Sequence, residues 1–451
     1  MKNLKTSGRF VSAGVAFVLL LGILAGAFYF HGVGSAVHAA APYKSHPIKV
    51  KPATTPTTFD GKHNLFTCQE PGALVRCYSP YQMRVAYDTQ PLLKDGVDGA
   101  GQTIVIIDAF QSPTVRQDLK TFNLTFGLHF STLNIIAPDG LTPWNPNDPN
   151  QVGWAEEISL DVQWAHAIAP YATIDLVLAK SNQDTDIFNA IQYAVKNNLG
   201  SVISMSFGEA EACMDPTLMA AQHQVFQNAV DKGITIFASA GDNGSAQPAC
   251  NGNGYIQAVS TPASDPLVTG VGGTYLNANT SSGIYYGEQA WNETDIVDGA
   301  SGGGYSSVYS RPAYQVDFNH NKTQRGVPDI AYNASVNGGV LVHLGFLGSN
   351  SGFYIFGGTS AGSPQMAGEL ALVNQVFGRQ GNINPTLYEG FARHGYSEYF
   401  HDITVGTNAL VTTGIPGYST TTGWDPVTGL GSLILGNTFG LTSTSKTAFK
   451  W

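Results

Sequence analysis

Charged side chains are scarce in this chain of 451 residues, because Asp, Glu, Lys and Arg make up 12% of it, about half the usual share of roughly 25%. Disordered chains, coiled coils and nucleic-acid-coating proteins all depend on charge, so the composition excludes these classes. Positive charge is scarcest, since 22 Lys and Arg stand against 32 Asp and Glu, for a net charge of −10. We therefore expect no nucleic-acid partner, and such an acidic surface suits a protein that works at low pH.

Cysteine is also rare, and the chain contains Cys68, Cys77, Cys213 and Cys250. An even number of cysteines in an exported chain indicates two disulfides. Proximity in the sequence favours the pairs Cys68–Cys77 and Cys213–Cys250, which is one of three possible pairings. A metal site is the alternative, but the sequence contains neither a Cys-x-x-Cys nor a His-x-x-x-His pair.

Long apolar runs are limited to one, at residues 11–30, which follows Lys2, Lys5 and Arg9. This pattern predicts an export signal that is cleaved after Ala39. The run is also long enough to span a bilayer, so an uncleaved membrane anchor is the alternative. In both cases the rest of the chain faces outward. We expect a secreted protein, or one attached to the outer face of the membrane by this segment alone.

From residue 103 onward, apolar runs typical of strands alternate with segments of helical periodicity. We expect strands at 103–107, 172–179, 201–206, 234–238 and 267–271, and helices at 154–168, 186–197 and 216–232. This alternation is typical of βαβ units in a parallel sheet. Ligands of such sheets bind at the carboxyl ends of the strands.

A candidate nucleophile, Ser360, lies in the string Gly-Thr-Ser-Ala-Gly-Ser-Pro at residues 358–364. The string follows a β-like run and leads into an apolar helical stretch at 366–377. Ser360 would therefore meet the unpaired N–H groups and the positive dipole of a helix start. A capping role for Thr359 or Ser360 is the alternative. The full string is more specific than a cap, and it resembles the nucleophile segment of subtilisin-like serine peptidases.

A catalytic histidine is missing, because none of the 11 histidines lies in the His-Gly-Thr context of subtilisins. His166 is the nearest candidate, and we expect it to be packed or on the surface. Glu157 and Asp161 stand in its place, and their i,i+4 spacing puts both carboxylates on one helix face. Two such acids tend to share one proton, which suits general acid/base chemistry. The alternative is a pair of solvated acids in the first turn.

Asp242 stands after Ala-Gly, at the end of the expected strand 234–238, where subtilisins carry an asparagine that donates to the oxyanion. A carboxyl group donates a hydrogen bond only when it is protonated, so this position calls for acid pH or a raised pKa. The alternative is a turn-forming aspartate in Gly-Asp-Asn-Gly.

Taken together, Ser360, Glu157, Asp161 and Asp242 resemble the sedolisin family of serine-carboxyl peptidases. The segments 78–84, 301–306, 326–330 and 423–431 resemble this family as well. The resemblance implies a subtilisin-like α/β fold, with a parallel sheet and helices on both faces. It also implies that Ser360 is the nucleophile, Glu157 the general base, Asp161 its orienting partner and Asp242 the oxyanion donor. Asp108 falls where some members place a supporting carboxylate.

The resemblance further implies sites for the substrate and for one structural Ca²⁺ ion. The substrate-binding residues would be Ser206, Phe207, Gly208, Gly302 and Gly303, and the metal ligands Asp402, Ile403, Thr421, Gly423 and Asp425. Two carboxylates with carbonyl oxygens suit a hard cation such as Ca²⁺.

The sequence thus predicts three parts: a signal peptide or membrane anchor at 1–39, a Pro- and Thr-rich tether at 40–77, and one large peptidase domain at 78–451. Sedolisins usually carry a large prodomain before the catalytic domain, and the 40–77 segment is too short for one. We expect a monomeric, exported, acid-active endopeptidase that cleaves peptides or unfolded proteins through an acyl-enzyme. A neutral subtilisin-like peptidase and a non-enzymatic surface binding module are the alternatives.

Overall fold

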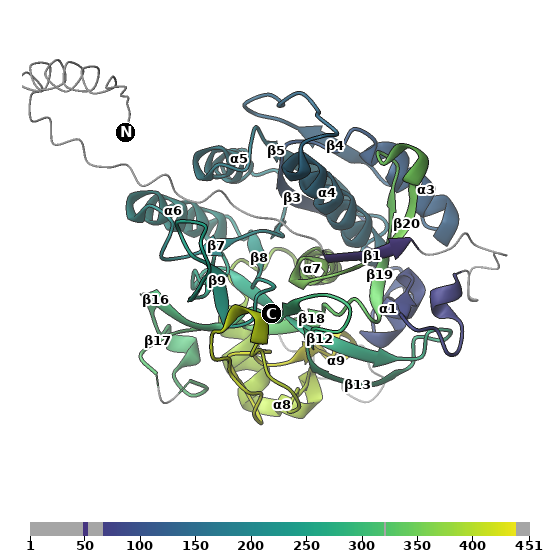
Figure 1. The fold of residues 1–451 in the computed structure, drawn as a ribbon. Helices are drawn as coiled ribbons and strands as arrows, with labels where there is room; N and C mark the ends of the chain where they lie inside the picture. The colour runs from purple at the N-terminus through teal and green to yellow at the C-terminus, as the bar shows by residue number, and fades with distance from the viewer. Residues whose placement is uncertain (1–47, 53–65, 320–321, 439–451) are drawn as a thin grey trace, which may run out of the picture. The chain divides into compact units, whose positions relative to one another are not determined.

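The computed structural model describes residues 48–52, 66–319 and 322–438 (Figure 1). All of these belong to one compact unit. The expected signal or anchor at 1–39 lies outside the described residues. Among the described helices, none has the length and apolarity needed to cross a membrane.

The core of the unit is an eight-stranded sheet in the order β13-β12-β8-β6-β3-β5-β4, with β18 also paired to β12. All neighbours are parallel except β12 and β13, which are antiparallel. The strands are β3 (Thr103–Ala109), β4 (Leu133–Ile136), β5 (Thr173–Ala179), β6 (Val202–Met205), β8 (Thr235–Ser239), β12 (Thr269–Ala278), β13 (Tyr285–Ala290) and β18 (Ile330–Asn333).

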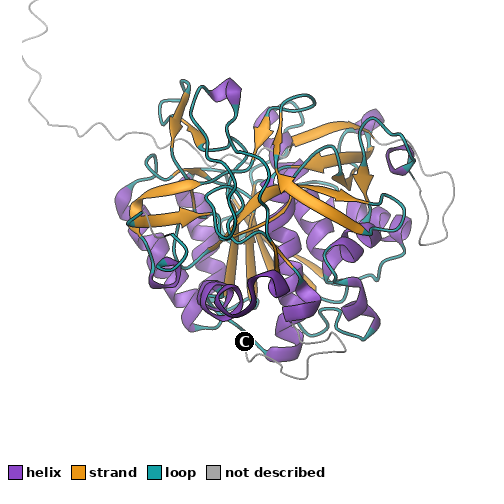
Figure 2. Ribbon diagram, turned by 90° about the horizontal axis from the view of Figure 1, so that it is seen from below, coloured by secondary structure: helices purple, strands orange, loops and turns teal. Residues whose placement is uncertain are grey.

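Helices cover both faces of this sheet (Figure 2). One face carries α3 (Val115–Phe126), α4 (Pro149–Ile168) and α7 (Gly362–Phe377), and the other carries α5 (Asp184–Lys196) and α6 (Pro216–Asp231). Successive side chains of a strand point to opposite faces. Accordingly, Ile104 and Ile106 of β3 pack in the α4–α7 core, whereas Val105 and Ile107 pack in the α5–α6 core. Burial on both faces explains why β3 reads as one continuous apolar run.

A smaller sheet has the order β1-β20-β19-β2, formed by β1 (Ile48–Pro52), β20 (Gly352–Gly357), β19 (Gly339–Leu344) and β2 (Cys77–Tyr78). Phe66 is buried in the main core, so the packed part of the chain begins before Tyr78. The structure has both expected disulfides, Cys68–Cys77 and Cys213–Cys250.

The remaining elements are short and surround the two sheets. They are α1 (Pro80–Ala86), α2 (Gln90–Lys94), β7 (Glu209–Ala210), β9 (Ala246–Pro248), β10 (Tyr255–Gln257), β11 (Ser260–Thr261), β14 (Asn292–Glu293), β15 (Gly299–Ala300), β16 (Gly304–Ser310), β17 (Gln324–Val327), a π-helix (Thr386–Ala392), α8 (Arg393–Tyr399), β21 (Phe400–His401), β22 (Ser432–Leu433) and α9 (Leu435–Thr438), with 3₁₀ turns at Thr67–Gln69, Ala313–Gln315, Gly348–Asn350, Thr359–Ala361 and Val411–Thr413.

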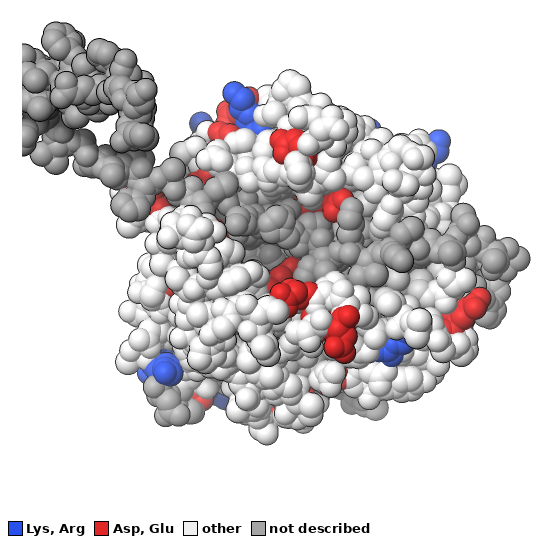
Figure 3. All heavy atoms as spheres, viewed as in Figure 1, with Lys and Arg blue, Asp and Glu red and all other residues white. Residues whose placement is uncertain are grey.

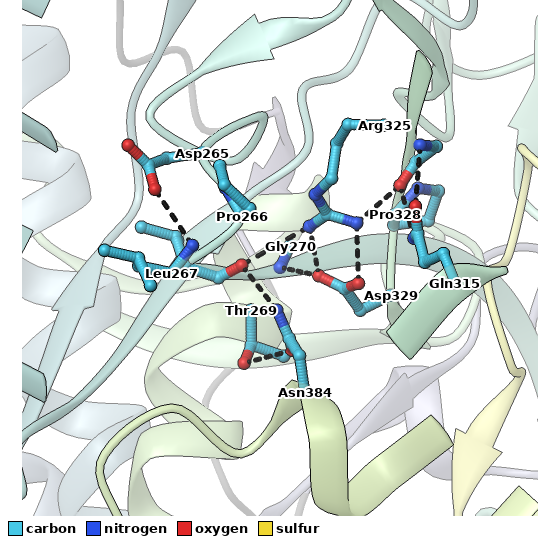
Figure 4. Close-up of polar contacts among 12 residues, drawn as sticks. Asp265, Pro266, Leu267, Thr269, Gly270, Gln315, Arg325, Pro328, Asp329 and Asn384 are labelled. Atoms are coloured by element: carbon cyan, nitrogen blue, oxygen red, sulfur yellow. Dashed lines mark hydrogen bonds and ion pairs between the residues drawn. The ribbon is translucent and has the colours of Figure 1, made fainter. Parts of the chain in front are cut away.

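A buried ion pair fixes the 326–330 segment to the main sheet (Figure 4). Arg325 donates to both carboxylate oxygens of Asp329, at 2.8 and 2.6 Å, and neither side chain is exposed. Asp329 also accepts the backbone N–H of Gly270 at 2.8 Å, which ties the pair to β12. This part of the family-like sequence therefore has a structural role, since it anchors the strand β18.

Candidate active site

The carboxyl ends of three neighbouring parallel strands meet at one edge of the sheet. Asp108 lies near the end of β3, Ser206 directly follows β6, and Asp242 lies three residues after β8. Parallel α/β sheets place their ligand sites at this edge. The helix α4 brings Glu157 and Asp161 to the same place, and the turn before α7 brings Ser360 there, so segments far apart in the sequence converge.

Ser360 lies in the 3₁₀ turn Thr359–Ala361, between the end of β20 and the start of α7. Its hydroxyl Oγ lies 3.3 Å from Glu157 Oε2 and 3.2 Å from the carbonyl oxygen of Ser206. The hydroxyl proton therefore has two acceptors, one of which is a carboxylate. This contact brings Ser360 and Glu157 together, although they are 203 positions apart.

Glu157, Asp161 and Asp108 form a cluster of carboxyl groups that are fully buried. Burial raises the pKa of Glu157 well above its usual value, and the nearby carboxylates of Asp161, Asp108 and Asp242 raise it further, whereas the Ser360 hydrogen bond lowers it. Burial also raises the pKa of Asp161 to about 8, although hydrogen bonds from Ser206 and Glu157 lower it. Burial and Asp161 raise the pKa of Asp108 well above its usual value. Such a cluster releases a first proton more readily than a second.

Asp242 lies beside the same turn, in contact with Thr359. Its Oδ1 accepts the backbone N–H of Thr359 at 2.8 Å and the Thr359 hydroxyl at 2.7 Å. Burial raises the pKa of Asp242 to about 6, although these two hydrogen bonds lower it. A Cβ atom on Gly358 would lie 2.6 Å from Asp242 Oδ2, and Gly358 has φ +97°. Gly358 therefore provides both the turn and the space for this carboxyl group.

Among the described residues, no histidine is within hydrogen-bonding distance of Ser360. His166 is fully buried, and its ring contacts the Ser131 hydroxyl at 2.9 Å and the carbonyl oxygen of His129 at 2.8 Å. Burial lowers the pKa of His166 to about 3. His166 is therefore a packed core residue and stays neutral.

A cavity of about 240 Å³ opens next to Ser360. Ser206, Phe207 and Gly208 line it, together with Glu209, Cys213, Ser239, Gly241, Asp242, Asn243, Gln247, Pro248, Tyr255, Ser260, Thr359 and Ser360. Acidic side chains also lie near the middle of the face in Figure 3, where Lys and Arg are few.

The two glycines expected in the substrate cleft pack behind the Asp242 loop and are not among the residues that line this cavity. Gly302 donates its N–H to the carbonyl oxygen of Gly241 at 2.7 Å, and Gly303 donates to Gly244 at 3.3 Å. A Cβ atom on Gly302 would lie 2.1 Å from the carbonyl oxygen of Ala240. The structure thus places these glycines as close-packed supports of the Asp242 loop.

The expected calcium ligands lie together in one loop cluster. Asp402 accepts the N–H of Gly423 at 3.1 Å, and Asp425 accepts the N–H of Thr421 at 3.0 Å. Within the described part of the chain, the carbonyl oxygens of Ile403, Thr421 and Gly423 accept no hydrogen bond. Two carboxylates and three free carbonyls suit Ca²⁺. The described residues contain no group of three or more His, Cys, Asp or Glu side chains that could hold a metal, so such a site would depend on the carbonyls.

Glu209 and Gln247 line the cavity and were not predicted from the sequence. Neither belongs to a recognisable motif, and their convergence depends on two short strands, β7 and β9. Glu209 stands directly after the Ser206–Gly208 segment, and this adjacency was the one signal available.

Comparisons with known proteins give one family. The model of the subtilase family matches residues 145–387. Kumamolisin from Bacillus sp. (strain MN-32) is 35% identical over 380 residues, covering 82% of this chain and 64% of that protein. Sedolisin from Pseudomonas sp. (strain 101) is 32% identical over 372 residues, covering 79% and 60%. The chain thus spans about three fifths of the length of these relatives.

A further relative is tripeptidyl-peptidase sed1 from Aspergillus fumigatus, which is 31% identical over 404 residues, with 79% of this chain and 56% of that protein covered. Among solved structures, Pseudomonas sedolisin in complex with two molecules of pseudo-iodotyrostatin aligns with a TM-score of 0.71 and 28% identity. The alignment covers 83% of this chain and all of that one. The subtilisin-like fold expected from the sequence is confirmed.

Proposed function

The chain belongs to the subtilase family, in its sedolisin branch, and on this premise we propose that it is a serine-carboxyl endopeptidase. It hydrolyses peptide bonds of peptides or unfolded proteins through an acyl-enzyme on Ser360. The observation that carries the proposal is the contact between Ser360 Oγ and Glu157 Oε2, at 3.3 Å, inside a buried carboxyl cluster. A hydroxyl group needs an adjacent base to become a nucleophile, and Glu157 is the side chain placed to act as that base.

The mechanism follows from these positions. Ionised Glu157 accepts the Ser360 proton while Oγ attacks the carbonyl carbon, and the electron pair of the carbonyl moves onto its oxygen. Neutral Asp242 and the backbone N–H of Ser360 donate to that oxyanion. Glu157 then gives its proton to the leaving amine, and an ester on Ser360 remains. Water, deprotonated by Glu157, releases the acid by the reverse sequence, with Asp161 holding Glu157 in orientation.

Acid activity follows from the protonation state that Asp242 needs. Its pKa is raised to about 6 by burial, so it keeps its proton, and donates, on the acid side of pH 6. Once the cluster of Glu157, Asp161 and Asp108 has taken up its last proton, Glu157 has no capacity to accept the Ser360 proton. Burial favours this uptake, because it raises the pKa of all three carboxyl groups. We therefore expect the highest activity on the acid side of pH 6, with a lower limit where the cluster takes up its last proton.

One structural Ca²⁺ belongs to the proposal, held by Asp402 and Asp425 and by the carbonyl oxygens of Ile403, Thr421 and Gly423. When bound, the ion would tie two loops together and supply no chemistry to the reaction. A monomeric enzyme exported from the cell, either secreted or held at the outer face of the membrane, completes the proposal. The acidic composition, with 32 Asp and Glu against 22 Lys and Arg, supports work in an acidic surrounding.

The test is cleavage of a denatured protein by the purified full chain across pH 2–8, with Ser360→Ala as the matched variant. We expect cleavage below pH 6 by the wild type and none by the variant. An optimum above pH 7 would instead favour a neutral subtilisin-like peptidase. No cleavage at any pH, together with no trapping of Ser360 by a peptide aldehyde, would favour a binding module.

The mode of attack needs a separate measurement, because some relatives are named tripeptidyl-peptidases. N-acetylated peptides of ten residues distinguish the modes, since removal of N-terminal tripeptides requires a free amine. We expect internal cleavage of the acetylated peptides. Cleavage confined to peptides with a free amine would overturn the endopeptidase assignment and leave the serine chemistry intact.

A further inference from the structure

Glu209 presents an unpaired carboxyl group at the cavity beside Ser360. It lies in β7, directly after the Ser206–Gly208 segment, and it lines the cavity. The side chain is 6% exposed, and neither carboxyl oxygen has a hydrogen-bond partner among the described residues. Buried polar groups without partners are costly and rare. The arrangement therefore indicates a partner that arrives with the substrate.

A second unpaired group lines the same cavity. Gln247, in β9, is 4% exposed, and its Nε2 is buried and makes no hydrogen bond to any described residue. A Cβ atom on Gly241 would lie 2.9 Å from this Nε2, which places the amide against the Asp242 loop. The cavity thus carries an unused NH₂ group in addition to the carboxyl group.

Glu209 is neutral wherever the proposed enzyme works. Burial raises the pKa of Glu209 to about 9, and the carboxylate of Asp184 raises it further. The residues that line the cavity include no Lys, Arg or His, so no cation opposes these two effects. A neutral carboxyl group has one O–H donor and one carbonyl acceptor. With the NH₂ group of Gln247, the cavity therefore offers three donors and one acceptor.

We propose that Glu209 and Gln247 recognise a side chain that ends in a primary amide, glutamine or asparagine, on the substrate residue whose carbonyl Ser360 attacks. The proposal rests on the peptidase function above. The cavity borders both Ser360 and Asp242, so the residue that supplies the attacked carbonyl is the one whose side chain enters it. The oxygen of the substrate amide accepts hydrogen bonds from the Glu209 O–H and from the Gln247 NH₂ group. The NH₂ group of the substrate amide donates to the Glu209 carbonyl oxygen.

Other side chains fit this set of groups less well. An aliphatic side chain leaves both Glu209 and Gln247 unpaired, and sites built for hydrogen bonds strongly reject analogues that lack them. A basic side chain would require Glu209 to ionise in a site that already holds the carboxyl group of Asp184 nearby. A primary amide therefore pairs with the Glu209 O–H, the Glu209 carbonyl and one N–H of Gln247 without a change of charge.

The test compares kcat/KM at pH 4 for four peptides that differ only at this position, with Gln, Leu, Glu or Arg. For the wild type we expect Gln to exceed Leu by at least about tenfold. Glu209→Met, which removes donor and acceptor at similar volume, should bring the Gln-to-Leu ratio to about one. Glu209→Gln, which keeps one donor and one acceptor, should restore part of the ratio. Glu389→Met, at an exposed position outside the cavity, is the control and should leave the ratio unchanged.

Three results would overturn the proposal: a wild-type ratio near one, a ratio that survives Glu209→Met, or a wild-type preference for Arg. Binding of the same peptides to full-length Ser360→Ala, measured by calorimetry, tests recognition without chemistry. Preferential binding of the Gln peptide with no turnover by the wild type would refute the proposed function and leave the recognition site standing. Turnover by the wild type without any preference for Gln would refute the recognition site and leave the proposed function standing.

Discussion

Asp242 holds the position where a subtilisin presents an amide, and the two groups differ in how they depend on pH. An amide donates at every pH, whereas a carboxyl group donates only while it keeps its proton. The structure supports the donor role in two ways. Thr359 occupies Oδ1 with two hydrogen bonds, which leaves Oδ2 for the proton, and burial raises the pKa to about 6.

Replacement of Asp242 tests this role directly. Asp242→Asn should keep part of the activity and lose less of it as the pH rises through 6, because the amide does not titrate. Asp242→Ala should lower kcat by roughly 10²–10³, the usual effect of one lost oxyanion donor, with little change in KM. The measurement is kcat of the three proteins at pH 3, 4, 5 and 6 on one peptide. An Ala variant within a few-fold of the wild type would show that Asp242 is a turn residue.

The site residues that could be predicted from the sequence are those that lie in a recognisable motif or at a short, regular spacing. Glu157 and Asp161 had to share a helix face because they are one turn apart, and Ser360 stood in a recognisable string. Glu209 and Gln247 were not predicted, because each is a single polar residue outside any motif. They come together only through the packing of β7 and β9. The resemblance assigned Gly302 and Gly303 to the substrate, and this assignment stays a prediction; in the structure their N–H groups bond to the Asp242 loop, which no local pattern reveals.

At the scale of elements, the contact between α4 and α7 determines whether Ser360 meets Glu157. Gly368 of α7 lies against α4, and a Cβ atom there would lie 2.7 Å from the Cβ of Ile168 and 3.1 Å from the carbonyl oxygen of Ala165. Both neighbours are backbone-proximal atoms that have no freedom to rotate away. The absence of a side chain at Gly368 is thus what allows the two helices to approach.

Gly368→Ala should therefore separate the helices and weaken the Ser360–Glu157 contact. We expect a loss of roughly 1–3 kcal/mol in the free energy of unfolding from overpacking, and a fall in kcat of up to about 10²-fold from misplaced catalytic groups. The control is Gly390→Ala, where a Cβ atom meets nothing closer than 3.7 Å. A Gly368→Ala enzyme with wild-type kcat would mean that the helix spacing does not set the catalytic geometry.

The loops around Asp402 and Asp425 give a second prediction at this scale. If they hold Ca²⁺, the ion binds the native state and stabilises it by mass action. Added EGTA should lower Tm at pH 6, added Ca²⁺ should restore it, and Asp425→Asn should remove the dependence. Mg²⁺ in place of Ca²⁺ serves as the control, because it prefers a stricter octahedral site. A Tm that is the same with and without EGTA would eliminate the metal site.

The long elements of the fold were predictable because their periodicity is strong. The expected helix 216–232 appears as α6, Pro216–Asp231, and the expected strand 234–238 as β8, Thr235–Ser239. The strands β4 and β18 have four residues each and were missed. β6 is equally short, but it stands between the predicted helices 186–197 and 216–232, a context that neither β4 nor β18 has. β12 extends to Ala278, beyond the expected end at 271, because its second half pairs with β13, a partner that no local pattern reveals.

At the scale of the whole molecule, buried carboxyl groups link stability to pH. Burial raises the pKa of Glu209 to about 9, of Asp161 to about 8 and of Glu369 to about 8. In the unfolded chain these groups have ordinary values near ~4. Above that pH the unfolded state has released protons that the native state still holds, so raising the pH favours unfolding. This contribution to stability is fully present below about pH 4 and is lost as the pH rises through 8–9.

We therefore expect Tm to be highest near pH 4 and to fall steadily toward pH 8. This pH dependence is opposite to that of proteins whose stability relies on ionised surface pairs. Glu369 allows a test outside the proposed catalytic groups, because its buried carboxyl contacts the Tyr332 hydroxyl at 3.1 Å. Glu369→Gln keeps an acceptor there and removes the titration, so its Tm should fall less between pH 5 and 8 than that of the wild type. Glu389→Gln, at an exposed position, should follow the wild-type curve. A wild-type Tm that stays level or rises from pH 4 to 7 would show that these carboxyl groups do not remain protonated in the native protein, and the neutral form of Glu209 would lose its basis with them.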